Sequence, residues 1–239
     1  MIVDGINVVR ELLNSNIRIE KIIAEDCDNR DIEKLVNIAK SQRVKVEVVA
    51  KKDLERIAKA KTQGIIAFVP NYKYVEVDDI LAYANEKGEN PFIVILDGIN
   101  DPHNLGAIIR TCECAGVHGV IIPENRACDI TDTVYRTSAG AVCHMRVAMV
   151  TNLTRTIKQL QKQGVWVYGL EAGSKSIYDE NFNYPTAIVV GSEGKGVSRL
   201  VLDSVDQVVS MDMFGKVNSL NASNASAVAI YEVVRQRRK

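Results

Sequence analysis

The stretch that says most about the fold is Phe92-Ile93-Val94-Ile95-Leu96, an apolar run that leads directly into the polar loop at residues 97–104. A segment with helical character, residues 105–115, follows the loop. A continuously apolar strand followed by a helix is typical of a parallel sheet that is covered on both faces. This stretch therefore predicts an α/β fold.

The same alternation continues toward the carboxyl terminus. Strands are predicted at residues 92–96, 119–122, 165–169, 187–190 and 207–211, and helices at residues 105–115, 151–163 and 221–237. Residues 1–70 show a shorter alternation, typical of a small α/β unit near the lower size limit for independent folding. A polar segment without helical periodicity, residues 70–79, indicates a linker. We expect a domain at 1–70, a linker with a first helix at 71–90, and a second domain at 91–239.

Composition narrows the classes of protein that the chain can represent. Thirty Lys and Arg balance thirty Asp and Glu, and this neutrality argues against a protein that coats nucleic acid without selectivity. Five cysteines without C-x-x-C spacing and three scattered histidines make a metal site unexpected. No signal peptide and no apolar run long enough to span a membrane is visible, so we expect a cytoplasmic protein.

Three polar loops each follow a predicted strand of the second domain. They are residues 97–106, residues 191–197 and residues 211–226. Ligands of open α/β sheets bind outside the carboxyl ends of the strands, so these loops are expected to converge on one site.

The first loop runs into a helix that carries Arg110 among the apolar residues Ile108, Ile109 and Cys112. An arginine in such a setting needs a carboxylate, a phosphate or a substrate as its partner. From this loop alone, a structural ion pair is as good an interpretation as a catalytic role.

The second loop, Gly191-Ser192-Glu193-Gly194-Lys195-Gly196, allows a ligand to approach the main chain closely. It matches neither G-x-x-x-x-G-K-[ST] nor G-x-G-x-x-G, and the carboxylate of Glu193 would repel a pyrophosphate. Both points count against ATP and NAD. In the third loop, Ser219 or Asn221 suits the N-cap of the last helix, and the small residues around Leu220 would let a flat ligand or another subunit approach.

In this order and spacing, the loops resemble the three motifs of the SpoU/TrmH class in the SPOUT superfamily of RNA methyltransferases. The matching runs are Asn104-Leu105-Gly106-Ala107-Ile108-Ile109-Arg110-Thr111, Gly191-Ser192-Glu193-Gly194-Lys195-Gly196 and Asn218-Ser219-Leu220-Asn221-Ala222-Ser223. The runs 4–9 and 63–67 are similar to the L30e-like substrate-binding domain of that family. The runs 101–104 and 138–141 are most similar to bacterial 23S rRNA guanosine-2′-O-methyltransferases of the RlmB type.

The resemblance implies a fold, a reaction and a site. It implies an α/β protein with a small L30e-like amino-terminal domain and a SPOUT parallel-sheet domain with a carboxyl-terminal trefoil knot. It also implies an S-adenosylmethionine donor, 23S rRNA as the acceptor, a homodimer and no metal. The implied catalytic residues are Arg110, Asn104, Glu193, Ser219 and Asn221, and the implied cofactor-binding residues are Gly191, Met211, Leu220, Gly194 and Gly196.

Other functions stay open at this point. Within the class, the acceptor could be a guanosine of tRNA or an adenosine of rRNA. Outside it, the chain could be an inactive RNA-binding dimer, although the joint presence of Arg110, Glu193, Ser219 and Asn221 speaks against that. A nucleotide-binding dehydrogenase fails because the dinucleotide fingerprint is missing.

Overall fold

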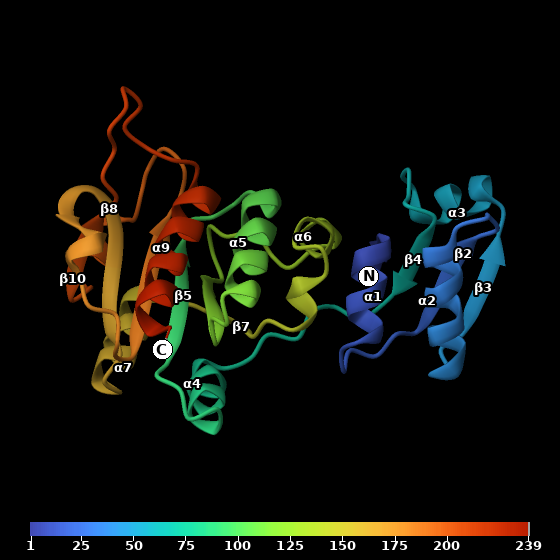
Figure 1. Cartoon of the computed structure of the whole chain (residues 1–239), viewed down its shortest axis with the longest axis horizontal. Coiled ribbons are helices and arrows are strands. Elements are labelled where there is room, and N and C mark those ends of the chain that lie inside the picture. The colour runs from blue at the N-terminus through green and yellow to red at the C-terminus, as the bar shows by residue number, and fades with distance from the viewer. Residues whose placement is uncertain (239) are drawn as a thin grey trace. The chain divides into compact units, whose positions relative to one another are not determined.

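The computed structural model describes residues 1–238 and divides the chain into two compact α/β units (Figure 1). The first unit comprises Met1–Lys73 together with Ile130–His144. The second comprises Tyr74–Asp129 and the chain from Met145 onward. The predicted α/β class is confirmed. No helix within residues 1–238 has both the length and the hydropathy needed to cross a membrane.

The first unit is built on a four-stranded sheet in the order β1-β4-β2-β3. Its elements are β1 (Ile2–Asp4), α1 (Ile6–Leu13), β2 (Lys21–Glu25), α2 (Arg30–Ser41), β3 (Val46–Val49), α3 (Lys51–Ala58) and β4 (Ile65–Phe68). Strand β4 runs antiparallel to both β1 and β2, whereas β2 and β3 are parallel. The buried side chains Ile23, Leu54 and Ile66 form a core between α3 and the sheet.

A segment from the second half of the sequence completes the first unit. It contains α6 (Asp132–Thr137) and the short 3-10 helix η1 (Ala141–Cys143). Gly140 has a φ of +87° and leaves no room for a Cβ, which would lie 2.8 Å from Cβ of Glu11. The His144 ring also contacts the Glu11 carboxylate at 2.9 Å. The expected second domain, residues 91–239, included this segment; the structure packs it instead with residues 1–73, because its contacts are long-range and leave no periodic pattern.

The second unit contains a six-stranded sheet in the order β10-β8-β9-β5-β6-β7, and every neighbouring pair is parallel. Its strands are β5 (Phe92–Asp97), β6 (Gly119–Pro123), β7 (Val147–Val150), β8 (Trp166–Ser176), β9 (Thr186–Gly191) and β10 (Gln207–Ser210). The predicted parallel sheet is therefore confirmed. Strand β7 was not predicted, although its residues form a short apolar run like those of the other strands.

Helices cover both faces of this sheet, as the apolar strands predicted (Figure 1). The second unit's helical segments are α4 (Val77–Glu86), α5 (Pro102–Cys114), α7 (Leu153–Lys162), η2 (Ile177–Asp179), α8 (Arg199–Leu202) and α9 (Ala222–Arg237). On one face, Ile80 of α4 and Ile157 of α7 pack against strand residues such as Ile93. Helices α5 and α9 contact each other, and α9 also contacts β9.

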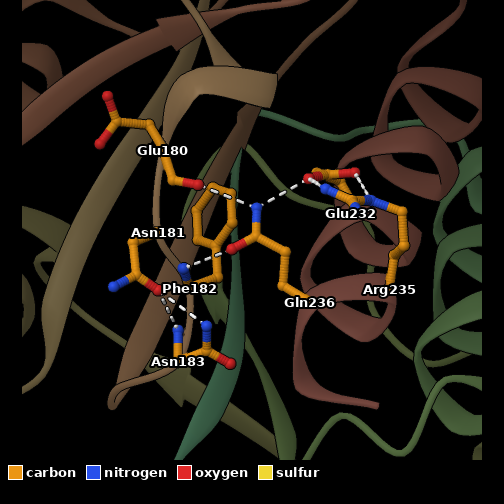
Figure 2. A network of polar contacts seen from close by, with 7 residues as sticks. All are labelled: Glu180, Asn181, Phe182, Asn183, Glu232, Arg235 and Gln236. Atoms are coloured by element: carbon orange, nitrogen blue, oxygen red, sulfur yellow. Dashed lines mark hydrogen bonds and ion pairs between the residues drawn. The ribbon is translucent and has the colours of Figure 1, made fainter. Parts of the chain in front are cut away.

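Side chains near the end of α9 form hydrogen bonds with the segment between η2 and β9 (Figure 2). Gln236 donates to the carbonyl oxygen of Glu180 at 2.8 Å and accepts from the amide of Phe182 at 2.9 Å. It also donates to the buried carboxylate of Glu232, which accepts two further bonds from Arg235. These contacts hold the last turns of α9 against a segment about fifty residues earlier in the sequence.

Arg237 anchors the same helix end. Its guanidinium donates to four backbone carbonyl groups, those of Asn90, Pro91, Phe182 and Tyr184. In the basic tail at residues 235–239, Arg235 and Arg237 are therefore bound within the protein. Lys239 lies outside the described residues.

Candidate active site

A cavity of about 710 Å³ lies at the carboxyl edge of the six-stranded sheet. Three segments line the cavity. The first, residues 170–172, lies within β8. The second, residues 190–196, begins at the end of β9, and the third, residues between 210 and 225, begins at the end of β10. The predicted convergence of the second and third loops on one site is thus observed. The first loop contributes through α5, as described below.

An irregularity in β8 supplies the first wall of the cavity. Gly169 pairs with Val208 of β10, but the next residue of β10, Val209, pairs with Lys175. The intervening residues of β8 are not paired with β10, and Leu170, Glu171 and Ala172 line the cavity instead. A bulge of this kind redirects side chains away from the regular pleat.

The second wall is a tight turn at residues 192–196. The amide of Ser192 donates to the carbonyl of Gly196 at 3.1 Å, and the amide of Gly196 donates back at 3.0 Å. A Cβ on Gly191 would lie 2.0 Å from the carbonyl carbon of Gly196, so only glycine fits there. Gly194 adopts the left-handed region with a φ of +80°.

A polar network at the cavity joins all three motifs. The Glu193 carboxylate accepts from the Asn104 side-chain amide at 2.9 Å, and it also accepts from the Asn221 amide. Asn221 additionally donates to the side-chain oxygen of Asn104 at 3.2 Å. Glu193 thus pairs with Asn104 and Asn221, two other residues of the implied catalytic set. Two amide donors stabilise its negative charge, since hydrogen bonds to an ionised acceptor are strong.

Asn221 has a second role as the N-cap of α9. Its side-chain oxygen accepts from the amides of Ser223 at 2.9 Å and Asn224 at 3.4 Å. The oxygen therefore faces the helix and the nitrogen faces Glu193. The choice left open between Ser219 and Asn221 as the helix cap is resolved in favour of Asn221.

Arg110 lies on α5 with its side chain exposed to solvent. No carboxylate within residues 1–238 forms an ion pair with it at 4.0 Å or less. The structural ion pair, which the sequence left as an equal alternative, is not found within this part of the chain. The hydrogen-bond donors of Arg110 are therefore available to a ligand.

The remaining expected site residues lie together at the cavity. Those in its wall are Gly191, Gly194, Gly196, Met211, Ser219 and Leu220. Asn104 reaches the same place from the first turn of α5, which begins at Pro102 with Asp101 as its N-cap.

Sequence reasoning gave no role to two carboxylates at this edge, Asp97 in the first loop and Glu171 of β8. Asp97 accepts from the amide of Ser198 at 2.7 Å, and Glu171 accepts from the amide of Val197 at 3.0 Å. Glu171 comes two residues after a predicted strand, so the rule that located the three loops could have found it as well.

Matches to two family models identify the family to which the protein belongs. A model described as the SpoU rRNA Methylase family matches residues 91–231. A second, described as RNA 2′-O ribose methyltransferase substrate binding, matches residues 2–75. The chain belongs to the SpoU rRNA methylase family. It is an S-adenosylmethionine-dependent RNA 2′-O-ribose methyltransferase, and the resemblance inferred from its three loops is confirmed.

Individual proteins agree with this assignment. The YacO protein of Bacillus subtilis (strain 168), named for the TrmH family of tRNA/rRNA methyltransferases, is 42% identical over 235 residues, which is 98% of this chain and 94% of the relative. The SpoU methyltransferase AviRb from Streptomyces viridochromogenes, solved in complex with AdoMet, has the same fold, with a TM-score of 0.84 at 23% identity over 99% of this chain and 90% of its own. A TrmH/SpoU tRNA modifying enzyme from A. aeolicus has a TM-score of 0.56 at 27% identity, over 62% of this chain and 76% of its own.

The cavity of this SpoU family member suits S-adenosylmethionine. Its volume of about 710 Å³ is within the range of small-molecule sites. Apolar side chains such as Met211 and Leu220 suit the flat adenine, and the glycines expose backbone groups to it. The carboxylate of Glu193 lines the cavity, and a carboxylate there repels a pyrophosphate. When bound, S-adenosylmethionine supplies a methyl group activated by its positively charged sulfonium.

Proposed function

We propose that this enzyme methylates the ribose 2′-hydroxyl of a guanosine in the peptidyl-transferase region of 23S rRNA. The observation that carries the proposal is the first unit, which matches the substrate-binding model at residues 2–75. AviRb covers 99% of the chain, whereas the A. aeolicus tRNA modifying enzyme covers only 62%. An enzyme that retains a separate RNA-binding unit is suited to a large, folded RNA. The proposal places the enzyme in the cytoplasm, where ribosomal RNA is found.

In this proposal Arg110 acts on the acceptor. A ribose hydroxyl is a poor nucleophile, so its oxygen must be polarised, or its proton removed, as it attacks the methyl group. The guanidinium of Arg110 is exposed and without a carboxylate partner among residues 1–238, so it is free to bind an RNA phosphate and to stabilise negative charge on the oxygen. A guanidinium is protonated at neutral pH, which argues against Arg110 as a literal base.

The network around Glu193 would orient the reacting groups. Asn104 and Asn221 hold the Glu193 carboxylate between α5 and α9, and Ser219 lies in the adjacent cavity wall. Oxygen, methyl carbon and sulfur must be aligned in a methyl transfer, and a rigid network reduces the entropy lost in reaching that alignment. Backbone groups of Gly191, Gly194 and Gly196 would contact the donor.

The family's architecture completes the proposal. We expect residues 1–70 to be an L30e-like RNA-binding domain, residues 71–90 a linker with the first helix, and residues 91–239 a SPOUT domain with a trefoil knot. The side-chain anchors at the end of α9 would hold the knotted segment in place. Val228 and Tyr231 of α9 are 37% and 46% exposed and lie one turn apart, which supports a homodimer that covers this face.

Methyl transfer to defined RNAs tests the proposal. The purified enzyme, tritiated S-adenosylmethionine, and 23S rRNA and bulk tRNA from a strain lacking this protein would be incubated in parallel, and the labelled nucleotide mapped. We expect label on the 2′-oxygen of a guanosine in 23S rRNA. Label confined to tRNA, or to an adenosine, would instead support the corresponding enzyme of the same class. RNA binding without any label would support the inactive RNA-binding dimer.

A further inference from the structure

The turn that carries Glu193 emerges from the sheet between two carboxylates. It leaves β9 after Gly191, and β9 lies between β8 and β5. Asp97, the last residue of β5, is paired in register with Gly191. Glu171 of β8 directly follows Leu170, which pairs with Val190. One carboxylate therefore stands on each side of the strand end from which the turn rises.

Both carboxylates bind the chain where it returns from the turn. Glu171 Oε2 accepts from the amide of Val197 at 3.0 Å, and Asp97 Oδ2 accepts from the amide of Ser198 at 2.7 Å. These two amides belong to consecutive residues, and they follow Gly196 at the end of the turn. Two neighbouring strands thus hold the returning chain through successive amide groups, and each amide donates to a carboxylate oxygen.

The turn needs such external contacts because it is rich in glycine. Gly194 and Gly196 have φ values of +80° and +65°, and glycine loses more conformational entropy on folding than any other residue. A Cβ on Gly196 would lie 2.3 Å from Glu171 Oε2, so the carboxylate packs directly against this residue. Within the turn, the only backbone bonds among the described residues are the pair between Ser192 and Gly196.

We propose that Asp97 and Glu171 are positioning residues that clamp the turn at residues 192–196 and thereby shape the donor-binding cavity. The clamp holds the backbone of the turn against Gly191, and it places Glu193 within reach of Asn104 and Asn221. Neither carboxylate needs to touch the reacting atoms for this role. Its consequence is that the affinity for S-adenosylmethionine depends on two residues outside the three sequence motifs.

Calorimetric titration with S-adenosylmethionine alone tests the clamp, because it requires no RNA substrate and so stays separate from the choice of acceptor. The variants are Asp97→Ala and Glu171→Ala, which remove the acceptor oxygen, and Asp97→Asn and Glu171→Gln, which keep one. We expect each alanine variant to raise the Kd for S-adenosylmethionine about tenfold, which corresponds to about 1.4 kcal/mol. The amide variants are expected within about threefold of wild type, a rescue consistent with hydrogen bonding.

Asp206→Ala is the matched control. Asp206 Oδ2 accepts from the amide of Val167 at 2.8 Å, the same kind of bond to β8, but Asp206 is not in the cavity wall. We expect this variant to lower the melting temperature without changing the Kd. The clamp is refuted if the alanine variants bind within twofold of wild type, if Asp206→Ala weakens binding as much as they do, or if the amide variants bind as poorly as alanine.

Hydrogen exchange of the wild-type protein provides a second measurement that needs no variant to fold. The amides of Val197 and Ser198 are expected to exchange slowly, with protection close to that of the neighbouring strand β9. The amide of Lys195, for which no acceptor is found within residues 1–238, is expected to exchange fast. Fast exchange at Val197 and Ser198 as well would overturn the clamp.

Discussion

The two edges of the six-stranded sheet carry similar residues but use them differently. At the amino edge, Arg237 binds four backbone carbonyls, and the buried His118 accepts from the amide of Phe92. At the carboxyl edge, glycine loops surround a cavity, and Arg110, on the helix α5 that starts at this edge, is exposed without an ion pair among residues 1–238. One edge satisfies its polar groups internally, whereas the other leaves donors available to a ligand.

The difference shows that the number of cations in a segment says little about where a polyanion binds. The tail at residues 235–239 is the most basic run of the chain, yet two of its arginines are bound within the protein. Arg110 stands alone in an apolar helix and remains available. The zero net charge of the chain is therefore compatible with an RNA enzyme, because a few unpaired cations are sufficient for selective contacts.

Replacing Arg110, on the helix that starts at the carboxyl edge, has the largest expected effect. Arg110→Ala should lower kcat for methyl transfer by about 10²- to 10³-fold, because a charge that stabilises the transition state is lost. The Kd for S-adenosylmethionine and the melting temperature should stay unchanged, because the side chain is exposed. Arg238→Ala is the control, an exposed arginine at the amino edge, and turnover near wild type is expected for it. Equal activity of the two variants would show that Arg110 does not have the assigned role.

Replacing Arg237 tests the amino edge. Arg237→Ala should lower the free energy of unfolding by about 2–4 kcal/mol, because four carbonyl groups lose a charged donor. Chemical denaturation would measure the loss, and kcat per folded molecule should remain close to wild type. A large loss of kcat with normal stability would mean that the amino edge also takes part in the reaction.

Asn221 allows the cap of α9 to be separated from the network around Glu193. Asn221→Asp keeps an oxygen for the amides of Ser223 and Asn224, so the melting temperature should change little. It removes the donor to Glu193 and places a second carboxylate beside it, so kcat should fall about tenfold. Asn221→Ala should lose both stability, by about 1 kcal/mol, and activity. If Asn221→Asp is fully active, the contact with Glu193 is not needed for turnover.

The smallest effect concerns pH at the amino edge. Burial lowers the pKa of His118, although its bond to Glu89 opposes the shift. The unfolded chain, with a histidine pKa of about 6.5, then binds more protons than the folded one. Stability should therefore be fully present above that value and fall as the pH drops toward the native pKa. Comparing melting temperatures at pH 8 and pH 5.5 for wild type and His118→Gln checks this; the same drop in both proteins would contradict it.

Sequence patterns predicted most of the elements of this protein. Among them are the apolar strand Phe92–Asp97 and the three loops at one edge of the six-stranded sheet. The boundaries of α5 differ because Pro102 and Asp101 start the helix three residues early. The four-residue helix α8 is too short to show helical periodicity, and the apolar run of β7 was not interpreted as a strand. The packing of Ile130–His144 on the first unit was missed for a different reason: contacts between distant parts of the chain are not encoded in local patterns.

The sequence by itself determined the α/β class, the parallel sheet and the family, because strand periodicity and motif spacing are properties of neighbouring residues. Only the tertiary structure decided which charges are satisfied. It showed that Glu193 pairs with Asn104 and Asn221 while Arg110 stays exposed, and that Asp97 and Glu171 hold the turn between them. The physical reason is that a hydrogen bond depends on distance and direction, which residues 26 to 101 positions apart acquire only when the chain folds.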